Sequence, residues 1–304
     1  MYYKLTGFTY FPPSSPSPLT ASSSTIEQVA PAEVLRRHRV RIIGHGKPPL
    51  LLCNGFGYTQ GLWQQMTTAL AVHHQVILFD YVGAGAFDPQ AYDEQKYNSL
   101  QGYADDVVEL CRALDLREAV LVGHSVGATI AMLAAIAAPT HFRQVVLLTP
   151  SPCYLNEPGY YGGFERDNLQ QVLEDMRNDY RTWAFDFADL IMGPSHGATL
   201  GQELARFFYE TDARIAQQFA RVTFFSDNRA DVPQLQLPTL VVLSQDDVVA
   251  PAEVGEYLVR HLPQGQLVTL ATTGHCPQLS APLETLAVIR TFVDEPAEIF
   301  SKAA

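Results

Sequence analysis

The chain has 304 residues, of which 47% are hydrophobic and 17% are charged, a composition typical of a globular protein with one large domain or two smaller ones. Its 20 basic and 32 acidic side chains give a formal net charge of −12, and a surface of that sign argues against nucleic acid and anionic membranes as partners. No apolar run approaches the ~20 residues of a membrane-spanning helix.

Residues 1–33 are predicted to form an N-terminal extension without a catalytic role. Thirteen of the 21 residues from Phe11 to Pro31 are Ser, Thr or Pro, a composition that does not build a packed element. The first ten residues lack the basic segment and the continuous apolar run of a signal peptide.

After the extension, short apolar runs alternate with helical patterns. The predicted strands are residues 40–43, 50–53, 76–80, 119–122, 145–148, 240–243 and 267–270. The predicted helices between and after them are residues 62–72, 100–114, 128–138, 254–261 and 282–293. Continuous apolar strands indicate burial on both faces, which is typical of a parallel sheet. The pattern therefore predicts an α/β fold with helices on both faces of a mostly parallel sheet.

One long insertion interrupts this alternation between the strands at 145–148 and 240–243. Residues 154–225 contain 14 aromatic side chains in 72 positions, against 11% aromatic residues in the whole chain. Helical periodicity covers residues 165–180, 182–192, 200–210 and 212–225. An aromatic helical insertion between two strands is expected to form a cap over the carboxyl edge of the sheet. The predicted division is a core of residues 34–151 and 222–304 and a four-helix cap of residues 152–221.

The strongest chemical signal is the segment Gly123-His124-Ser125-Val126-Gly127. It stands between a predicted strand and a helix rich in small residues, which is the context in which a nucleophilic serine is held on a tight strand-to-helix turn. The glycines on either side let the strand and the helix approach each other. Ser125 is therefore predicted to be a nucleophile.

A serine nucleophile needs a histidine base and a carboxylate that orients it, and on this fold the acid and then the histidine follow the serine in the chain. Of the histidines after Ser125, only His275 lies in a loop directly after a predicted strand. The strand at 240–243 leads into Asp246 and Asp247. Spacing alone does not separate these two aspartates.

The oxyanion that forms during acyl transfer needs two backbone donors. The N–H of Val126 follows the nucleophile, and the glycine-flanked Phe56 follows the strand at 50–53, which is where the second donor is expected. The glycines at 83 and 85 suggest a dinucleotide loop only weakly, because Asp88 stands where a third glycine or alanine belongs. No cofactor is predicted.

The four cysteines, Cys53, Cys111, Cys153 and Cys276, lie far apart, and neither a CxxC pair nor a zinc-like histidine spacing accompanies them. They are expected to be reduced, mostly buried thiols of a cytoplasmic protein. No metal site is predicted.

Longer segments carry a family resemblance. The runs ILFDYVGAGAFD, VGHSVGA, TPSPCYLNEPGYYGGF, FFSDNR, DDVVAP and GHCPQLS closely resemble the RsbQ-type α/β-hydrolases, bacterial regulators of the sigma-B stress response. They resemble the plant karrikin and strigolactone receptors less closely. The resemblance implies that Asp247 is the acid, that the cap is a V-shaped set of four helices, and that Phe56, Val126, Trp183 and Phe224 line an apolar pocket. It also implies a signalling role with a phosphatase partner that carries a PAS domain.

Two functions remain open at this point. The first is a serine hydrolase that cleaves a small apolar ester or lactone through an acyl-Ser125 intermediate. The alternative is a ligand-binding signalling module whose cap engages a protein partner, with slow or vestigial hydrolysis.

Overall fold

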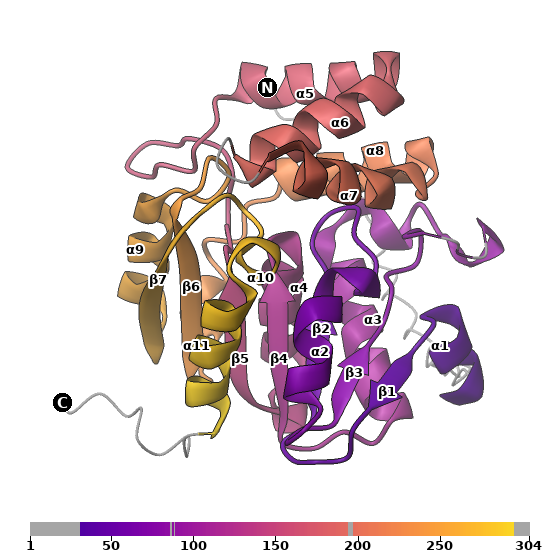
Figure 1. The fold of residues 1–304 in the computed structure, drawn as a ribbon, viewed down its shortest axis with the longest axis vertical. Helices are drawn as coiled ribbons and strands as arrows, with labels where there is room; N and C mark the ends of the chain where they lie inside the picture. The colour runs from indigo at the N-terminus through magenta and orange to yellow at the C-terminus, as the bar shows by residue number, and fades with distance from the viewer. Residues whose placement is uncertain (1–30, 86, 88, 194–196, 295–304) are drawn as a thin grey trace, which may run out of the picture.

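The computed structural model describes residues 31–85, 87, 89–193 and 197–294. Seven strands form one sheet in the order β1-β3-β2-β4-β5-β6-β7 (Figure 1). In chain order they are β1 (Arg41–Ile43), β2 (Leu50–Cys53), β3 (Val76–Leu78), β4 (Ala119–His124), β5 (Phe142–Leu148), β6 (Thr239–Asp246) and β7 (Gly265–Thr273). The predicted α/β-hydrolase fold class is confirmed.

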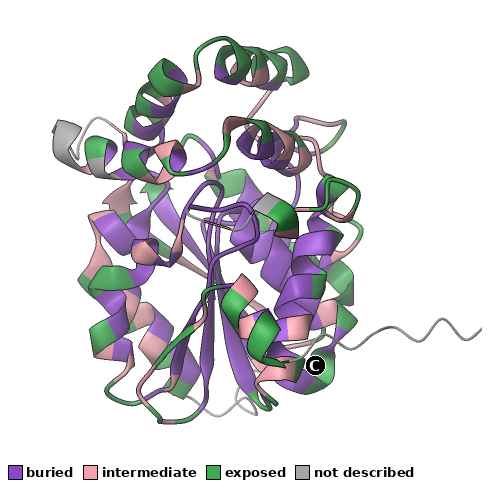
Figure 2. Cartoon of the chain, turned by 90° about the vertical axis from the view of Figure 1, so that its right-hand side faces the viewer, coloured by how far each residue is buried: buried purple, intermediate pink, exposed green. Residues whose placement is uncertain are grey.

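The sheet is parallel except at one edge, where β1 pairs antiparallel with β3. The neighbouring pairs from β3 to β7 are all parallel. Every residue of β2, β3 and β4 is buried, because helices cover both faces of these strands (Figure 2). This burial is the physical reason for their continuous apolar sequences.

Two pairs of helices cover the sheet. Helices α2 (Gln64–Leu70) and α11 (Pro282–Asp294) pack together on the face turned to the viewer in Figure 1, and α3 (Leu100–Ala113) packs against α4 (Val126–Ala137) on the other. Helix α9 (Ala252–His261) packs against β6 and β7. The remaining short helices are α1 (Pro31–Arg37), η1 (Gln60–Trp63), η2 (Pro89–Ala91), η3 (Lys96–Asn98), η4 (Pro139–His141), η5 (Val232–Gln234) and α10 (Pro277–Ser280).

Four helices between β5 and β6 lie across the top of the sheet in Figure 1. They are α5 (Arg166–Asn178), α6 (Tyr180–Met192), α7 (Gly197–Tyr209) and α8 (Ala213–Phe224). Asp179 and Asp212 accept hydrogen bonds from backbone N–H groups at the starts of α6 and α8, which stabilises these helix ends. Helix α8 continues past the predicted end of the cap at residue 221.

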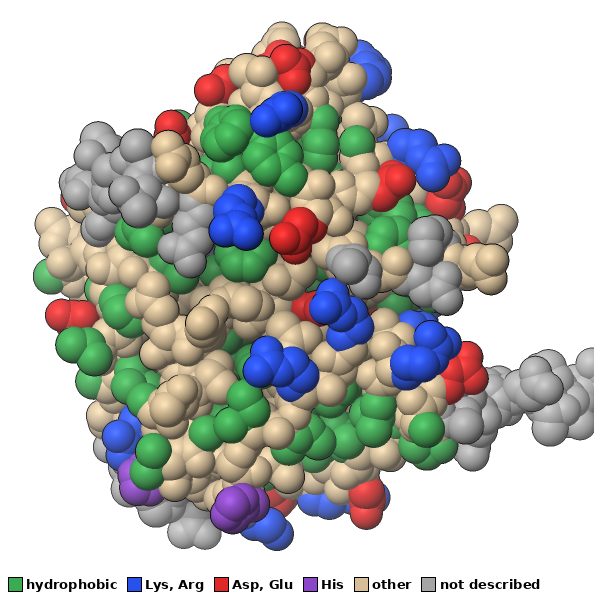
Figure 3. Space-filling view, turned by 45° about the vertical axis from the view of Figure 1, so that its right-hand side comes forward, with side chains coloured by type: hydrophobic (Ala, Val, Ile, Leu, Met, Phe, Trp, Pro, Cys, Tyr) green, Lys and Arg blue, Asp and Glu red, His purple; other side chains and the backbone are tan. Residues whose placement is uncertain are grey.

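The N-terminal extension predicted over residues 1–33 lies outside the described residues except for 31–33, which begin α1. In the described part of the chain, each helix is too short or too polar to cross a bilayer. Figure 3 shows one face, on which apolar side chains are intermingled with basic and acidic ones.

Candidate active site

Ser125 occupies a strained turn between β4 and α4. Its backbone has φ 56° and ψ −128°, a left-handed conformation that is uncommon for a residue with a side chain. A Cβ on Gly123 would lie 2.4 Å from the carbonyl oxygen of Gly127, and a Cβ on Gly127 would lie 2.2 Å from that of Asn54. The two glycines are therefore required for the close approach of strand, turn and helix.

The structure brings Ser125, His275 and Asp247 into one hydrogen-bonded chain. His275 Nε2 lies 2.8 Å from Ser125 Oγ, and His275 Nδ1 lies 2.7 Å from Asp247 Oδ2. All three side chains are buried. Asp247 Oδ1 also accepts the backbone N–H of Val249 at 2.8 Å, which fixes the carboxylate. Asp246, the other aspartate that spacing left open, is exposed.

The backbone of His275 is held from three directions. Its N–H donates to the carbonyl of Ile191 in α6 at 2.7 Å. Its carbonyl accepts hydrogen bonds from Thr149 Oγ1 at 3.0 Å and from His124 Nε2 at 2.8 Å. Sequence reasoning assigned no role to His124, because its contact with His275 spans 151 residues. The histidine that precedes the nucleophile is thus a positioning residue for the imidazole.

The two expected oxyanion donors have free N–H groups. Among the described residues, neither Phe56 N–H nor Val126 N–H has an intramolecular hydrogen-bond partner. The loop that carries Phe56 is fixed by the buried Asn54, which donates from Nδ2 to the carbonyl of Phe79 at 2.8 Å and accepts from Trp63 Nε1 at 2.8 Å. Donors fixed in this way are suited to stabilise an oxyanion.

A cavity between the cap and the sheet reaches Ser125. It is narrow, with a cavity volume of about 20 Å³, and its lining is mostly apolar and aromatic. The lining residues are Phe56, Tyr58, Ser125, Tyr154, Phe187, Ile191, Thr223, Phe224, Val249 and His275. We call this space the catalytic chamber. Of the predicted pocket residues, Phe56 and Phe224 line it.

Trp183 has a different place from the one expected. Its ring centroid lies 6.3 Å from that of Phe56 and 4.9 Å from that of Phe187, so it packs behind two residues of the catalytic chamber. Within the described part of the chain it is not among the lining residues themselves. Tyr154 was not predicted, although its hydroxyl lies 3.5 Å from Ser125 Oγ.

Comparison with known proteins decides the family. A sequence model described as the alpha/beta hydrolase family matches residues 50–288. The chain belongs to the alpha/beta hydrolase family. Karrikin insensitive 2 receptor CA of Petunia hybrida is 36% identical to this alpha/beta hydrolase over 253 residues, which cover 83% of the chain and 94% of that protein.

Other relatives agree with this assignment. Strigolactone esterase D14 of Arabidopsis thaliana is 35% identical over 258 residues, with 84% of this chain and 96% of that protein covered. The solved structure of a hydrolase from Oleispira antarctica matches with a TM-score of 0.85 and 36% identity, and covers 88% of this chain and 98% of its own. These relatives confirm the predicted resemblance to plant receptor hydrolases, and the chain is a hydrolase.

In this alpha/beta hydrolase, His124 is neutral at neutral pH. Burial lowers its pKa to about 3, and the neighbouring His275 adds to the decrease. In the unfolded chain the imidazole has its ordinary pKa of ~6.5. Below that pH the unfolded state binds a proton that the folded state excludes, so stability must fall as the pH drops from ~6.5 toward 3.

We therefore expect His124 alone to lower the free energy of unfolding by about 2 kcal/mol between pH 7 and pH 5. Urea unfolding at both pH values measures the loss of unfolding free energy between pH 7 and pH 5. This loss should be about 2 kcal/mol smaller in His124→Gln than in the parent protein. Glutamine keeps an N–H donor for the His275 carbonyl. His45→Gln, which changes an exposed histidine, is the control and should leave the loss unchanged. An equal loss in His124→Gln and the parent would contradict the assignment.

A second prediction concerns the hydrogen bonds of Asn54. The substitution Asn54→Ala leaves Trp63 Nε1 and the carbonyl of Phe79 without their buried partner. The free energy of unfolding is expected to fall by ~2–6 kcal/mol, because two buried groups lose their partner and each costs ~1–3 kcal/mol. Asn98→Ala, at an exposed position, should change it by less than ~0.5 kcal/mol. Equal stability of the two variants in urea unfolding would show that these bonds do not hold the loop.

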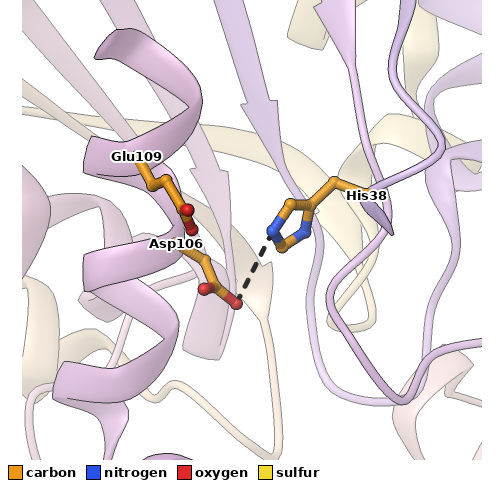
Figure 4. Close-up of side chains that lie close together, drawn as sticks. All are labelled: His38, Asp106 and Glu109. Carbon is orange, nitrogen blue, oxygen red and sulfur yellow. Dashed lines mark ion pairs between the residues drawn. The ribbon is translucent and has the colours of Figure 1, made fainter. Parts of the chain in front are cut away.

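The structure also gathers a cluster that sequence spacing did not reveal. The ligand atoms of His38, Asp106 and Glu109 lie within 4.8 Å of one another, and His38 Nε2 is 3.9 Å from Asp106 Oδ2 (Figure 4). However, Lys96 forms an ion pair with Asp106, and Arg37 forms one with Glu109. Since both carboxylates are already neutralised by cations, we interpret the cluster as an ion-pair network that joins α1 to α3.

Proposed function

We propose that this alpha/beta hydrolase cleaves small, mostly apolar carboxylic esters or lactones through an acyl-Ser125 intermediate. The observation that carries the proposal is the chain of hydrogen bonds from Asp247 through His275 to Ser125 Oγ beneath an apolar chamber. A serine hydroxyl becomes a competent nucleophile when a neutral imidazole can accept its proton and a carboxylate stabilises the resulting cation.

In the first half of the proposed reaction, Ser125 Oγ attacks the carbonyl carbon while His275 Nε2 takes the hydroxyl proton. The N–H groups of Phe56 and Val126 donate to the oxyanion of the tetrahedral intermediate. His275 then gives its proton to the leaving alkoxide as the bond between the carbonyl carbon and the alkoxy oxygen breaks. In the second half, water replaces Ser125 by the same steps and releases the carboxylic acid.

The names of relatives support an ester as the substrate class. They include a strigolactone esterase at 35% identity and a probable esterase of Oryza sativa subsp. japonica at 37% identity. The chamber beside Ser125 is lined by aromatic rings and the aliphatic Ile191 and Val249, so the substrate is expected to be apolar around its carbonyl group.

The test is rapid-mixing kinetics with p-nitrophenyl acetate. Formation of an acyl enzyme that is hydrolysed slowly should give a burst of p-nitrophenol close to one equivalent of enzyme, followed by a slower steady state. Lactone opening should be followed in parallel by acid release in a pH-stat. Failure to release p-nitrophenol or acid above the rate in buffer would overturn the proposed function.

A signalling role is a second candidate, favoured by the surface of α6. Phe185 and Leu190 are 39% and 52% exposed on this helix, and the helix also supplies the Ile191 carbonyl that holds His275. A cytoplasmic phosphatase with a PAS domain, in a sigma-B type stress response, is the partner that the sequence resemblance implies. The double variant Phe185→Ser/Leu190→Ser should lose binding to such a phosphatase while its turnover of p-nitrophenyl acetate stays normal. Retained binding would argue against this surface.

A further inference from the structure

Asp80 is a buried carboxylate outside the candidate triad. It lies two residues after the end of β3 and is only 2% exposed. Its Oδ1 accepts the backbone N–H of Gln60 at 2.7 Å, and its Oδ2 accepts Gln60 Nε2 at 3.2 Å. Arg39 Nη1 lies 3.5 Å from Oδ2 and supplies the opposite charge. Burying a charge costs free energy unless it is paired and hydrogen-bonded, and the hydrogen bonds of this carboxylate converge on Gln60.

Gln60 is the last residue of the loop that carries the expected oxyanion donor. We call residues 54–60, from the end of β2 to the first residue of η1, the oxyanion loop. Its first residue, Asn54, donates to the carbonyl of Phe79, and its last donates to the carboxylate of Asp80. Two consecutive residues after β3 therefore hold the two ends of the loop, and Phe56 lies between them.

The turn at residues 38–39 fixes Asp80 and Gln60 relative to each other. The backbone N–H of Asp80 donates to the carbonyl of His38 at 2.9 Å, and the carbonyl of Asp80 accepts a hydrogen bond from His38 Nδ1 at 3.1 Å. Gln60 Nε2 also donates to the carbonyl of Arg39 at 3.0 Å. A carboxylate whose own backbone is held on both sides is suited to hold the end of the loop in one place.

We propose that Asp80 is a positioning residue for the oxyanion donor, because its bonds to Gln60 set where the N–H of Phe56 lies. The inference rests on the proposed ester hydrolysis and names a residue that controls its rate. Among the described residues, Asp80 does not line the catalytic chamber, so it acts through the loop and not on the substrate. A displacement of about 1 Å can cost ~10²-fold in rate, which is comparable to removal of an oxyanion donor.

The first experiment replaces the carboxylate with an amide of nearly the same size. In Asp80→Asn the new NH₂ group faces a donor of Gln60, and Arg39 loses its anion, so the anchor weakens. We expect kcat for p-nitrophenyl acetate to fall ~10- to 100-fold with KM within twofold. Asp106→Asn changes another fully buried carboxylate, which pairs with Lys96 on α3, and should leave kcat within twofold. Equal losses in both variants would contradict the proposal.

A thiono substrate distinguishes a displaced oxyanion donor from a general loss of structure. In O-(4-nitrophenyl) thionoacetate, sulfur replaces the carbonyl oxygen and is a weak hydrogen-bond acceptor. Asp80→Asn should therefore lower kcat/KM for the oxygen ester at least ~5-fold more than for the thiono ester. Equal losses for the two substrates would show that Asp80 supports the fold and not the oxyanion donor.

Exchange of the two side chains is the second variant, and it restores the pairing of donor with acceptor. In Asp80→Asn/Gln60→Glu the carboxylate moves to residue 60, where it meets the amide of residue 80 and stays near Arg39. We expect kcat within ~5-fold of the parent. Gln60→Glu alone places two carboxylates together and should lower kcat at least ~10-fold. An exchange variant no faster than Gln60→Glu would overturn the inference.

Amide hydrogen exchange separates this inference from the proposed function. The N–H of Tyr58 is bonded to the carbonyl of Gly55 at 3.3 Å within the oxyanion loop, so its exchange reports opening of the loop without any substrate. Asp80→Asn should speed this exchange at least ~10-fold, and Asp106→Asn should not. Unchanged exchange in Asp80→Asn would overturn the inference even if the protein hydrolyses esters. If the parent hydrolyses no ester but the exchange responds as expected, the proposed function fails and the role of Asp80 in holding the loop remains.

Discussion

Replacing Ser125 with alanine is expected to lower kcat/KM for p-nitrophenyl acetate by ~10⁴ to 10⁶. The substitution removes the oxygen that lies 2.8 Å from His275 Nε2, so no covalent intermediate can form. The remaining N–H donors and the chamber supply only the residual rate. The measurement is initial-rate kinetics of the purified variant, with its fold checked by circular dichroism.

Ser244→Ala is the matched control for this prediction. Ser244 is also a buried serine near the end of a parallel strand, and its Oγ has no hydrogen-bond partner among the described residues. Its removal should change kcat/KM by less than twofold. Unchanged turnover in Ser125→Ala would show that another group performs the hydrolysis.

The second large effect is expected for Asp247→Asn, with a fall in kcat of ~10⁴. The amide is nearly the same size as the carboxylate, but it cannot stabilise the imidazolium and favours the wrong tautomer of His275. KM should change little, because Asp247 does not line the catalytic chamber among the described residues.

The adjacent aspartate gives a close control. Asp246→Asn makes the same chemical change one position earlier, at an exposed side chain, and should leave kcat within twofold. Kinetics of the two variants with one substrate therefore resolve the choice that spacing left open. A larger loss in Asp246→Asn than in Asp247→Asn would contradict the assignment of the acid.

The strands and most helices could be predicted from sequence because burial dictates their composition. Strands β2 to β4 are buried at every residue, and this leaves no polar positions to obscure the pattern. The edge strand β1 is mainly exposed, with the pattern exposed-exposed-intermediate, and nothing in its sequence specified antiparallel pairing with β3. Helix α1 also was not predicted, since its single buried residue is Val34.

The candidate triad could be proposed from sequence because its members follow strands whose carboxyl ends meet at one edge. Contacts that depend on how distant segments pack across the sheet could not be predicted from the sequence. The bond from His124 to His275 and the place of Trp183 behind Phe56 depend on how distant segments pack. The same holds for the catalytic chamber, whose lining combines residues of the loop after β2, of the cap helices and of the loop after β7.

The most direct test of covalent catalysis is mass spectrometry of the protein quenched within its first turnover of p-nitrophenyl acetate. We expect a mass increase of one acetyl group, located after proteolysis on the peptide that contains Ser125. Rapid ester turnover with no acyl adduct at Ser125, or with the adduct on another residue, would contradict it.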